Sequence, residues 1–419
     1  MKRDVTAVEV YLSLEGRDVR IGRLTREPRR GLEAIGFSYT DTWLEDPDRF
    51  ALQPGLVLAP GTYAPPTGRP VFGAIGDSAP DTWGRTLLRR AERRAASREG
   101  RPVRTLWELD FLMGVADVAR TGALRFRYEG GDRFEAPAPD GVPSIVHVRR
   151  LLGASDRTLR MTESAEDLRL LLAPGSSLGG ARPKASVVDS NGVLSIAKFP
   201  KEHDEYPLER WEAVALRLAE RAHIAAASAR VMDVDGRIAL IVRRFDRAGE
   251  RRVPYLSAMA MLDRADGERA SYLEIADAIA RYGARADADR RELYRRLAFN
   301  VLVSNVDDHL RNHGFLWEGR EGWRLSPAFD LNPTPVDVRE RTLTTSIDLE
   351  DGTCDLGLVL DVAPYFGLGG QEARSLIRSV AEGVGAWRTV ARSLGAGRSE
   401  IERMSSAFEH DDARAALRL

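Results

Sequence analysis

Apolar and polar residues alternate along the first part of the chain, which is the pattern of half-buried β-strands. Val8–Leu14 and Val19–Leu24 alternate on either side of Glu15–Asp18, so we expect a β-hairpin there, followed by a short strand over 37–44. A run rich in proline and glycine, Pro54–Pro70, predicts a long ordered loop. The pattern becomes helical from Trp83, Leu87 and Leu88 and again over Leu106–Val115. A β-rich first domain with attached helices is therefore expected.

The remaining chain carries turn and cap signals that separate short elements. Ser164 with Asp167 resembles a capping box ahead of a helix that should stop at Pro174-Gly175, and Ser271 with Glu274 repeats the pattern. Asn191-Gly192 tolerates the positive φ values of a tight hairpin turn. The other expected elements are strands over 185–188, 193–199 and 237–245, a helix over 208–222, and terminal helices over 373–387 and 400–408. A mixed α+β fold is expected, with the helices concentrated after Tyr255.

Domain boundaries follow from shifts in composition. The run from Gly130 to Pro143 is rich in glycine and proline and is the best candidate for a boundary. The predicted domains are 1–130, a β-rich domain; 131–250, a mixed lobe; and 251–419, a helical lobe.

The composition is that of a globular protein and limits the classes of function. The 419 residues give room for more than one hydrophobic core. No apolar run approaches the roughly 20 residues that a membrane-spanning helix needs. Met1–Asp4 leads straight into a strand-like pattern rather than a signal peptide, and the single cysteine, Cys354, excludes a disulfide framework. We expect a soluble, cytoplasmic protein of enzyme size with no membrane partner.

Arginine is concentrated locally although the net charge is only −1. Eight arginines occur from Arg85 to Arg104, and several of them have the i, i+4 spacing of one helix face. The stretch is either a solvated helix face or a contact for DNA or a protein partner, and the sequence leaves both open.

Only four of the 62 basic residues are lysine, and two of the four lie inside motifs. In Gly179–Lys184 two glycines allow the backbone to approach a phosphate closely, and Arg182 and Lys184 supply countercharge; the alternative is a simple turn. Lys198 ends an apolar strand, where it either protects a sheet edge or contacts a phosphate.

Two further segments complete this part of the pattern. Glu212, or Glu209 less favourably, begins the next helix and is a candidate partner for Lys198. Ile241–Arg247 then ends the mixed lobe, in the place where a kinase hinge offers backbone groups to adenine.

The strongest chemical signal lies in the loop after the apolar helix that ends near Leu302. Asp307 and Asn312 stand five residues apart, the spacing of the catalytic Asp and the metal-binding Asn in protein kinases. A hairpin over 315–325 should then deliver Asp330, a second carboxylate for Mg²⁺. A Zn or Fe site formed by His309 and His313 with Asp307 and Asp308 is the weaker alternative.

The chain resembles the HipA family of bacterial toxin kinases, which belong to type II toxin–antitoxin modules. The matching strings are DSAPDTWGR from Asp77 to Arg85, GALRF from Gly122, SSLGGARPKAS, IAKFP, RRFDR, NVDDHLRNHGF and SPAFDLNP, and they extend from about residue 70 to 335. The resemblance implies a two-lobed protein-kinase-like fold with an extra β-rich N-terminal domain. It also implies Mg-ATP as cofactor and phosphorylation of serine or threonine on a protein.

Site residues are carried over from the family position by position. The resemblance implies that Asp307 is the catalytic base, that Asn312 and Asp330 bind Mg²⁺, and that Ser177 is autophosphorylated, with Ser176 as the alternative. The implied ATP-binding residues are Gly179, Gly180, Ala181, Arg182, Lys184, Lys198, Arg243, Phe245, Asp246 and His309. Arg243 stands where relatives carry a hinge glutamate, which changes little because this contact uses the backbone.

The resemblance further implies partners. These are a HipB-like DNA-binding antitoxin, operator DNA reached through the antitoxin complex at the nucleoid, and an aminoacyl-tRNA synthetase, such as the glutamyl enzyme, as protein substrate. Two other functions stay open: a small-molecule kinase of the same fold, and a DNA-complex scaffold with a degenerate nucleotide site.

Overall fold

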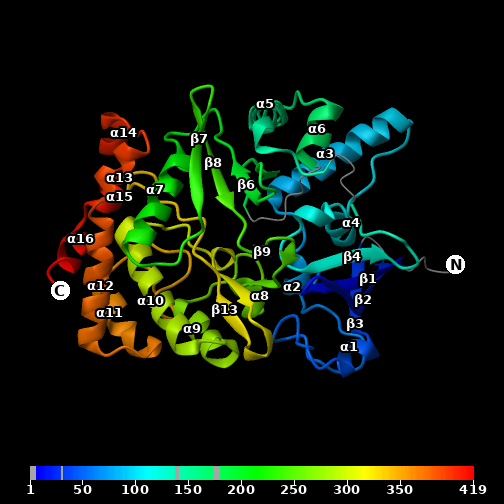
Figure 1. Ribbon diagram of the computed structural model, residues 1–419, viewed down its shortest axis with the longest axis horizontal. Coiled ribbons are helices and arrows are strands. Elements are labelled where there is room, and N and C mark those ends of the chain that lie inside the picture. The colour runs from blue at the N-terminus through cyan, green and yellow to red at the C-terminus, as the bar shows by residue number, and fades with distance from the viewer. Residues whose placement is uncertain (1–5, 30–31, 137–140, 173–179) are drawn as a thin grey trace. The chain divides into compact units, whose positions relative to one another are not determined.

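The computed structural model describes residues 6–29, 32–136, 141–172 and 180–419. The chain divides into two compact units, whose elements are labelled in Figure 1. The first unit comprises residues 1–202, 234–237 and 243–256, and the second comprises 203–233, 238–242 and 257–419. The boundaries expected at residues 130 and 250 stay predictions.

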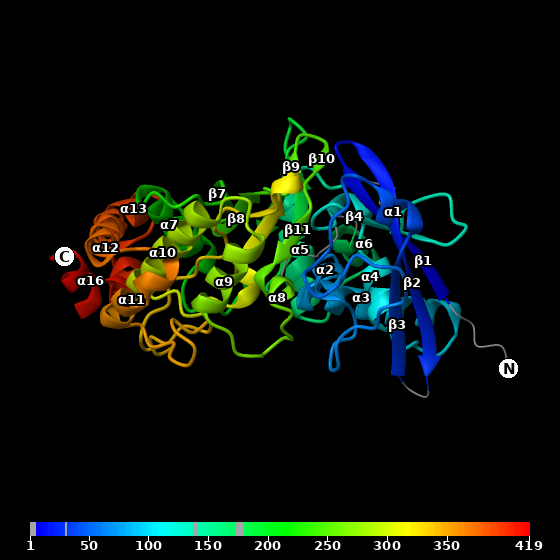
Figure 2. The ribbon, with the colours of Figure 1, turned by 90° about the horizontal axis from the view of Figure 1, so that it is seen from below.

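An antiparallel sheet begins the first unit, and Figure 2 shows its long strands side by side. Its strands are β1 (Thr6–Leu14), β2 (Arg17–Arg29), β3 (Leu32–Tyr39) and β4 (Leu124–Tyr128), in the order β3-β2-β1-β4. The turn between β1 and β2 has positive φ at Glu15 (48°) and Gly16 (80°), which suits a two-residue hairpin. Val8, Val10 and Leu12 of β1 are buried, so the expected hairpin is confirmed.

The strand expected over 37–44 is wrong in its second half. Residues 41–45 form a short helix, α1 (Asp41–Glu45), because the Thr40 hydroxyl accepts a hydrogen bond from the backbone N–H of Trp43 and caps the first turn. The indole of Trp43 is fully buried, which anchors this turn in the hydrophobic core.

Helices make up much of the rest of the first unit. They are α2 (Gly73–Gly76), α3 (Thr82–Glu99), α4 (Glu108–Met113), α5 (Val148–Leu159) and α6 (Ala165–Leu172), with the 3-10 helices η1 (Asp117–Ala119) and η2 (Ile145–His147). The capping box of α6 is confirmed, because Asp167 N–H donates to the Ser164 hydroxyl and Ser164 N–H donates to the Asp167 carboxylate. The end expected for α6 at Pro174-Gly175 lies outside the described residues.

A second hairpin of the first unit consists of β5 (Lys184–Val188) and β6 (Leu194–Lys198). Its turn is held by Asp189, whose carboxylate accepts from the N–H groups of Asn191 and Val193, and Gly192 has φ of 74°. The expected turn is therefore confirmed. The short strands β9 (Arg247–Ala248), β10 (Arg251–Arg252) and β11 (Tyr255–Ser257) follow later in the chain.

The second unit is mostly helical. Its helices are α7 (Leu208–Arg221), α8 (Ala258–Met261), α9 (Tyr272–Tyr282), α10 (Ala286–Val303), α11 (Leu356–Val362), α12 (Gly370–Val384), α13 (Trp387–Ser393), α14 (Arg398–Arg403), α15 (Ser405–Phe408) and α16 (Asp411–Ala416). The 3-10 helices are η3 (Leu310–Asn312), η4 (Gly319–Glu321) and η5 (Ala363–Phe366), and the strands are β7 (Ala229–Val234), β8 (Arg237–Arg243), β12 (Gly314–Trp317) and β13 (Trp323–Leu325). The expected helix over 208–222, the Ser271 capping box and the hairpin over 315–325 are confirmed.

Helix α10 forms the core of the second unit. Residues 296–303 are all buried, so this half of the helix is covered on every side, as its nearly continuous apolar sequence requires. Aromatic rings add a second cluster, in which Trp387 stacks on Phe408 with ring centroids 4.6 Å apart, and Trp211 of α7 lies 6.0 Å from Phe408. Across the part of the chain that is described, no helix is both long and apolar enough to cross a membrane.

Candidate active site

The loop that carries Asp307 begins where α10 ends. Ser304 adopts the left-handed conformation (φ 53°), which terminates the helix, and its buried hydroxyl donates to the carbonyl of Ala407. The helix therefore ends at Ser304, but the chain stays buried through Val306, and Asp307 is the first exposed residue of the loop.

Asp307 and Asn312 are joined by a direct contact. The Asn312 side-chain amide N–H donates to the backbone carbonyl of Asp307 over 3.1 Å, so its amide oxygen remains as the group that can bind a cation. The Asp307 side chain is 61% exposed, and its Oδ1 lies 3.2 Å from a guanidinium nitrogen of Arg339. Arg339 also donates from its other terminal nitrogen to the Thr344 hydroxyl over 3.1 Å, so its guanidinium group is fixed by two contacts. Sequence reasoning missed this arginine.

Asp308, next along the chain, faces the interior. Its carboxylate accepts a hydrogen bond from the Tyr272 hydroxyl and lies 3.1 Å from Nε2 of His313, and all three side chains are buried. Burial alone raises the pKa of this carboxyl group, but the charge and hydrogen bonds of His313 and Tyr272 outweigh it and lower the pKa. Asp308 is therefore an ionised internal anchor of the loop.

Asp330 follows the β12–β13 hairpin in the second unit. It has φ of 57°, a left-handed conformation that few residues other than glycine adopt and that Asp tolerates better than most. The side-chain amide of Asn332 donates to both the carbonyl and Oδ1 of Asp330, each over 3.1 Å. The carboxylate is thus held in one orientation by a residue two positions away.

The donor set suits magnesium better than zinc or iron. The carboxylate of Asp330 and the amide oxygen of Asn312 are hard oxygen donors, which Mg²⁺ prefers. The described ranges contain no group of three or more His, Cys, Asp or Glu residues able to hold a metal ion. His313 contacts Asp308, and Nδ1 of His309 has no hydrogen-bond partner among the described residues.

The phosphate-loop candidates belong to the first unit. Gly180 has φ of 92°, and Nζ of Lys184 lies close beside it, 3.2 Å from where a Cβ atom on Gly180 would stand. Lys184 is 4% exposed, and its ammonium group lies 2.8 Å from Oδ2 of Asp81. Its backbone carbonyl accepts from the indole N–H of Trp83 over 3.1 Å. The structure therefore assigns Lys184 a buried ion pair, and its contact with phosphate stays a prediction.

The other nucleotide-binding candidates are located as follows. Ala181 is exposed and Arg182 is half-buried, whereas Gly179, Ser177 and Ser176 lie outside the described residues. Lys198 ends β6 directly opposite Lys184 in the strand register. Arg243 is exposed at the end of β8. The rings of Phe245 and Tyr255 pack against each other with their centroids 6.3 Å apart. Glu209 and Glu212 are buried on α7 of the second unit. The roles of these residues toward a nucleotide stay predictions.

Asp246 is at the centre of a buried charge cluster in the first unit. Arg244 and Arg247 form ion pairs with its carboxylate, which also accepts the backbone N–H of Gly122 over 2.7 Å. Burial raises the pKa of this carboxyl group, but the two arginines lower it further than burial raises it. Asp246 thus joins the RRFDR string to the GALRF string, whatever its role toward a nucleotide.

The arginines of α3 and the segment after it are largely paired within the first unit. Arg85 lies 2.6 Å from Glu108, Arg90 lies 2.9 Å from Glu163, and Glu92 pairs with both Arg101 (2.5 Å) and Arg104 (3.1 Å). These contacts neutralise much of the local positive charge.

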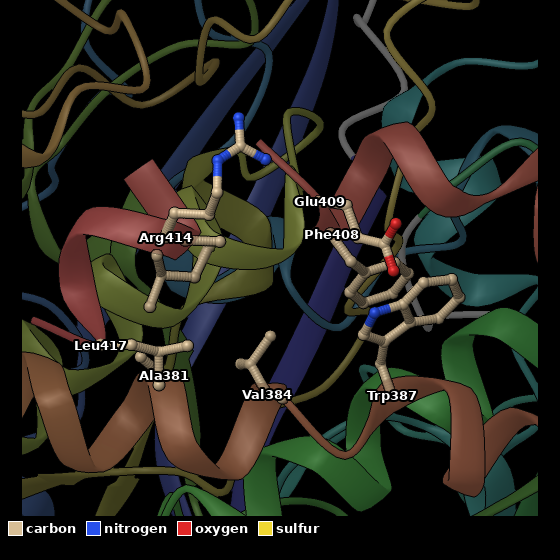
Figure 3. A pocket seen from close by; sticks show the side chains of 10 residues that line it. Ala381, Val384, Trp387, Phe408, Glu409, Arg414 and Leu417 are labelled. Carbon is tan, nitrogen blue, oxygen red and sulfur yellow. The ribbon is translucent and has the colours of Figure 1, made fainter. Parts of the chain in front are cut away.

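A cavity of about 330 Å³ occurs in the second unit, among its last helices (Figure 3). It is lined mainly by apolar side chains, including Ala381, Val384 and Leu417, with Arg414 and Glu409 also on its wall. None of the predicted site residues lines this cavity.

Comparison with known proteins finds one matching family and relatives named as kinases. Residues 176–388 match the family described as HipA-like C-terminal domain. A Sinorhizobium fredii protein named "Putative kinase Y4mE" is 27% identical over 344 residues, which cover 75% of each chain. A Haemophilus influenzae protein named "Putative kinase" is 26% identical over 179 residues, covering 38% of this chain and 52% of that protein.

Among solved structures, the fold resembles that of a chain in the Shewanella oneidensis "Toxin Antitoxin System HipA, HipB and its operator DNA complex". The TM-score is 0.67 at 19% identity, and the match covers 98% of this chain and 96% of the other. This similarity confirms the expected α+β fold with a β-sheet domain at its N-terminus. The family match, which spans half of the chain, includes Lys184, Lys198, Asp307, Asn312 and Asp330. The chain therefore belongs to the family of proteins with a HipA-like C-terminal domain.

Proposed function

We propose that the chain is an ATP-dependent serine/threonine protein kinase and the toxin of a HipA/HipB-like toxin–antitoxin pair. The observation that carries this proposal is the exposed carboxylate of Asp307 beside Asn312. The side-chain amide of Asn312 donates a hydrogen bond to the backbone carbonyl of Asp307. The same unit presents Asp330 in a fixed orientation through Asn332. The names of both relatives contain the word kinase, and the structural neighbour is a toxin–antitoxin complex, which supports the proposal.

The chemistry assigned to these residues is phosphoryl transfer. Asp307 orients the acceptor hydroxyl and takes its proton, while the hydroxyl oxygen bonds to the γ-phosphorus and the bond to the ADP oxygen breaks. Asn312 and Asp330 would hold Mg²⁺, which neutralises the phosphate charge when it is bound. Gly180, Arg182 and Lys198 would contact the phosphates, and the backbone groups of Arg243 and Phe245 would contact adenine.

Replacement of the proposed base tests the activity. Asp307→Asn removes the proton acceptor but keeps the size of the side chain, so phosphate transfer should fall about 10²- to 10⁴-fold. The measurement is incorporation of labelled phosphate from ATP by the purified protein, alone and in a cell lysate. Asp361→Asn, at an exposed position on α11, is the matched control and should keep wild-type activity.

The outcome separates the possible functions. A distinct labelled protein band that Asp307→Asn abolishes supports a protein kinase, whereas label found only in small molecules favours a kinase of small substrates. Equal activity of Asp307→Asn and the wild type contradicts the proposed base. Mapping the labelled residue on the protein itself decides between Ser177 and Ser176 as the site of autophosphorylation.

We further propose a HipB-like antitoxin as partner, with operator DNA reached through that complex, and an aminoacyl-tRNA synthetase as substrate. The support for the partner is the HipB and operator DNA named with the structural neighbour. The substrate rests on family resemblance, and phosphoproteomics after induction of the wild type and Asp307→Asn would identify it.

A further inference from the structure

Two loop segments that carry the proposed catalytic and metal-binding residues run side by side in the second unit. The backbone N–H of Thr334 donates to the carbonyl of Ser304, and the N–H of Asn332 donates to Oδ1 of Asn305, each over 3.0 Å. Asn305 precedes Asp307 by two residues, and Asn332 follows Asp330 by two. The side chain of Asn305 is therefore a direct link between the two segments.

This link is part of a longer chain of hydrogen bonds. Tyr272 donates to Asp308 and accepts from the side-chain amide of Asn300, over 2.8 Å in the second case. Oδ1 of Asn300 accepts from Nδ2 of Asn305 over 3.1 Å. Asn332 completes the connection from Asp308, the neighbour of Asp307, to the carboxylate of Asp330. Its backbone N–H donates to Asn305, and its side-chain amide donates to Asp330.

The direction of every hydrogen bond in this chain is fixed by its ends. The ionised carboxylate of Asp308 can only accept, so the Tyr272 hydroxyl must donate to it and accept from Asn300. At the other end, the backbone N–H of Asn332 can only donate, so Asn305 must present its oxygen there. If the Asn305 amide were flipped, its oxygen would face Oδ1 of Asn300 and its NH₂ group would face the backbone N–H of Asn332, so both hydrogen bonds would be lost.

Burial makes this arrangement costly to break. Tyr272 and Asn305 are fully buried, and Asn300 and Asp308 are each only 2% exposed, so water cannot readily replace a lost partner. A network whose members are all satisfied and enclosed holds its groups in a single arrangement. Asn332 and Asp330, at the far end, are only half-buried, which is where a ligand can be reached.

We propose that Asn305 is a positioning residue that fixes the carboxylate of Asp330 relative to Asp307 and Asn312. It acts through Asn332 and does not itself touch the metal or the substrate. The inference rests on the proposed function, because the orientation of Asp330 affects nucleotide binding only if Asp330 binds Mg²⁺ together with the nucleotide. It predicts that Mg²⁺ affinity, and not the stability of the fold alone, depends on Asn305.

The test uses the full chain and a non-hydrolysable ATP analogue. Asn305→Ala should raise the Mg²⁺ concentration needed for half-maximal binding of the analogue about tenfold, the usual effect of losing a group that orients a metal ligand. Asn332→Ala, a less buried change, should do the same by removing the last link. Hydrogen exchange of the backbone amides over 330–334 should become faster in both variants.

Tyr294→Phe is the matched control. Tyr294 lies on the same helix as Asn300, is fully buried, and donates to the carbonyl of Val359 outside the network. Its loss should lower stability without changing the Mg²⁺ requirement or the exchange over 330–334.

Three outcomes are possible. A raised Mg²⁺ requirement in Asn305→Ala and Asn332→Ala, with Tyr294→Phe unchanged, supports the inference. A requirement equal to the wild type in both variants overturns it, although the proposed function would stand. A wild-type chain that binds no nucleotide at any Mg²⁺ concentration overturns the proposed function and removes the basis of the inference.

Discussion

His410 shows how a single buried side chain depends on its protonation state. Its Nδ1 accepts the backbone N–H of Ala413 over 3.3 Å, which caps α16, and its Nε2 lies 3.2 Å from the carbonyl of Leu302. Only the neutral ring with a proton on Nε2 satisfies both contacts. Burial first, and the charge of Arg341 second, lower its pKa to about 4.

Acid should therefore destabilise the protein through this residue. The folded ring binds its proton less readily than the unfolded one, so its contribution to stability is complete above pH 6.5 and is lost as pH falls toward 4. The wild type should lose about 2 kcal/mol between pH 7.5 and 5 from this group. His410→Asn, which keeps a capping oxygen but does not titrate, should lose less over the same range in urea unfolding. Parallel losses in the two proteins would contradict this assignment.

Residue roles were predictable from sequence only where they lie close together in the chain. Asp307 and Asn312 are five residues apart, and their contact could be expected from that spacing. Asp308 accepts a hydrogen bond from Tyr272, which is 36 residues away in the sequence. Arg339, which contacts Asp307, is 32 residues away from it. Partners at such separations are set by tertiary packing, which no local pattern records.

At the scale of an element, α3 begins at a residue with two tasks. Oδ1 of Asp81 accepts the N–H of Gly84 as the helix cap, and Oδ2 forms the buried ion pair with Lys184. Both side chains of the pair are at most 5% exposed. The helix start and the last residue of the candidate phosphate loop are therefore held by one carboxylate.

Asp81→Asn separates the two tasks. Asn caps a helix as well as Asp, so the cap remains while the charge that balances Lys184 is lost. The free energy of unfolding should fall by about 3 kcal/mol, because the substitution removes one partner of a buried ion pair. Lys184→Met combined with Asp81→Asn should be more stable than Asp81→Asn alone, as measured by urea unfolding. A double variant that is less stable than the single one would show that the ion pair does not account for the effect.

Elements with local signals were predictable, and those without them were not. Both capping boxes and the Asp189–Gly192 turn are confirmed because their contacts lie within four residues. Helix α5 was missed although Val148, Leu151 and Leu152 have helical spacing, because Gly153 and the preceding Gly/Pro-rich run favoured a loop. Strand β7 was missed because only Val234 of its six residues is buried, which leaves no clear alternation.

At the scale of the whole molecule, the first unit depends on residues before and after position 130. Lys184 pairs with Asp81, Glu163 pairs with Arg90, and the cluster of Asp246 accepts the N–H of Gly122. A cut at residue 130 would remove Asp81 from Lys184, Arg90 from Glu163 and the Gly122 N–H from Asp246, so each buried group would lose one of its partners.

The fragment 131–419 should accordingly unfold at a lower temperature and less cooperatively than the full chain. Circular dichroism during heating measures this, and addition of the separate 1–130 fragment tests for partial rescue. A fragment that melts at the temperature of the full chain would support an independent domain boundary at 130. The fold class was predictable from the order of strand and helix patterns, but the interleaving of the units was not, because it depends on contacts between distant segments.

The interleaved units also have a consequence for synthesis on the ribosome. The chain leaves the first unit after residue 202, yet that unit is completed by residues 243–256, which emerge after the opening part of the second. Folding of the first unit therefore cannot be completed until more than half of the polypeptide has been made, because the Asp246 carboxylate that accepts the Gly122 N–H is synthesised only then. Asp330 emerges later still, so a nascent chain that ends before residue 330 cannot carry the proposed phosphotransfer activity.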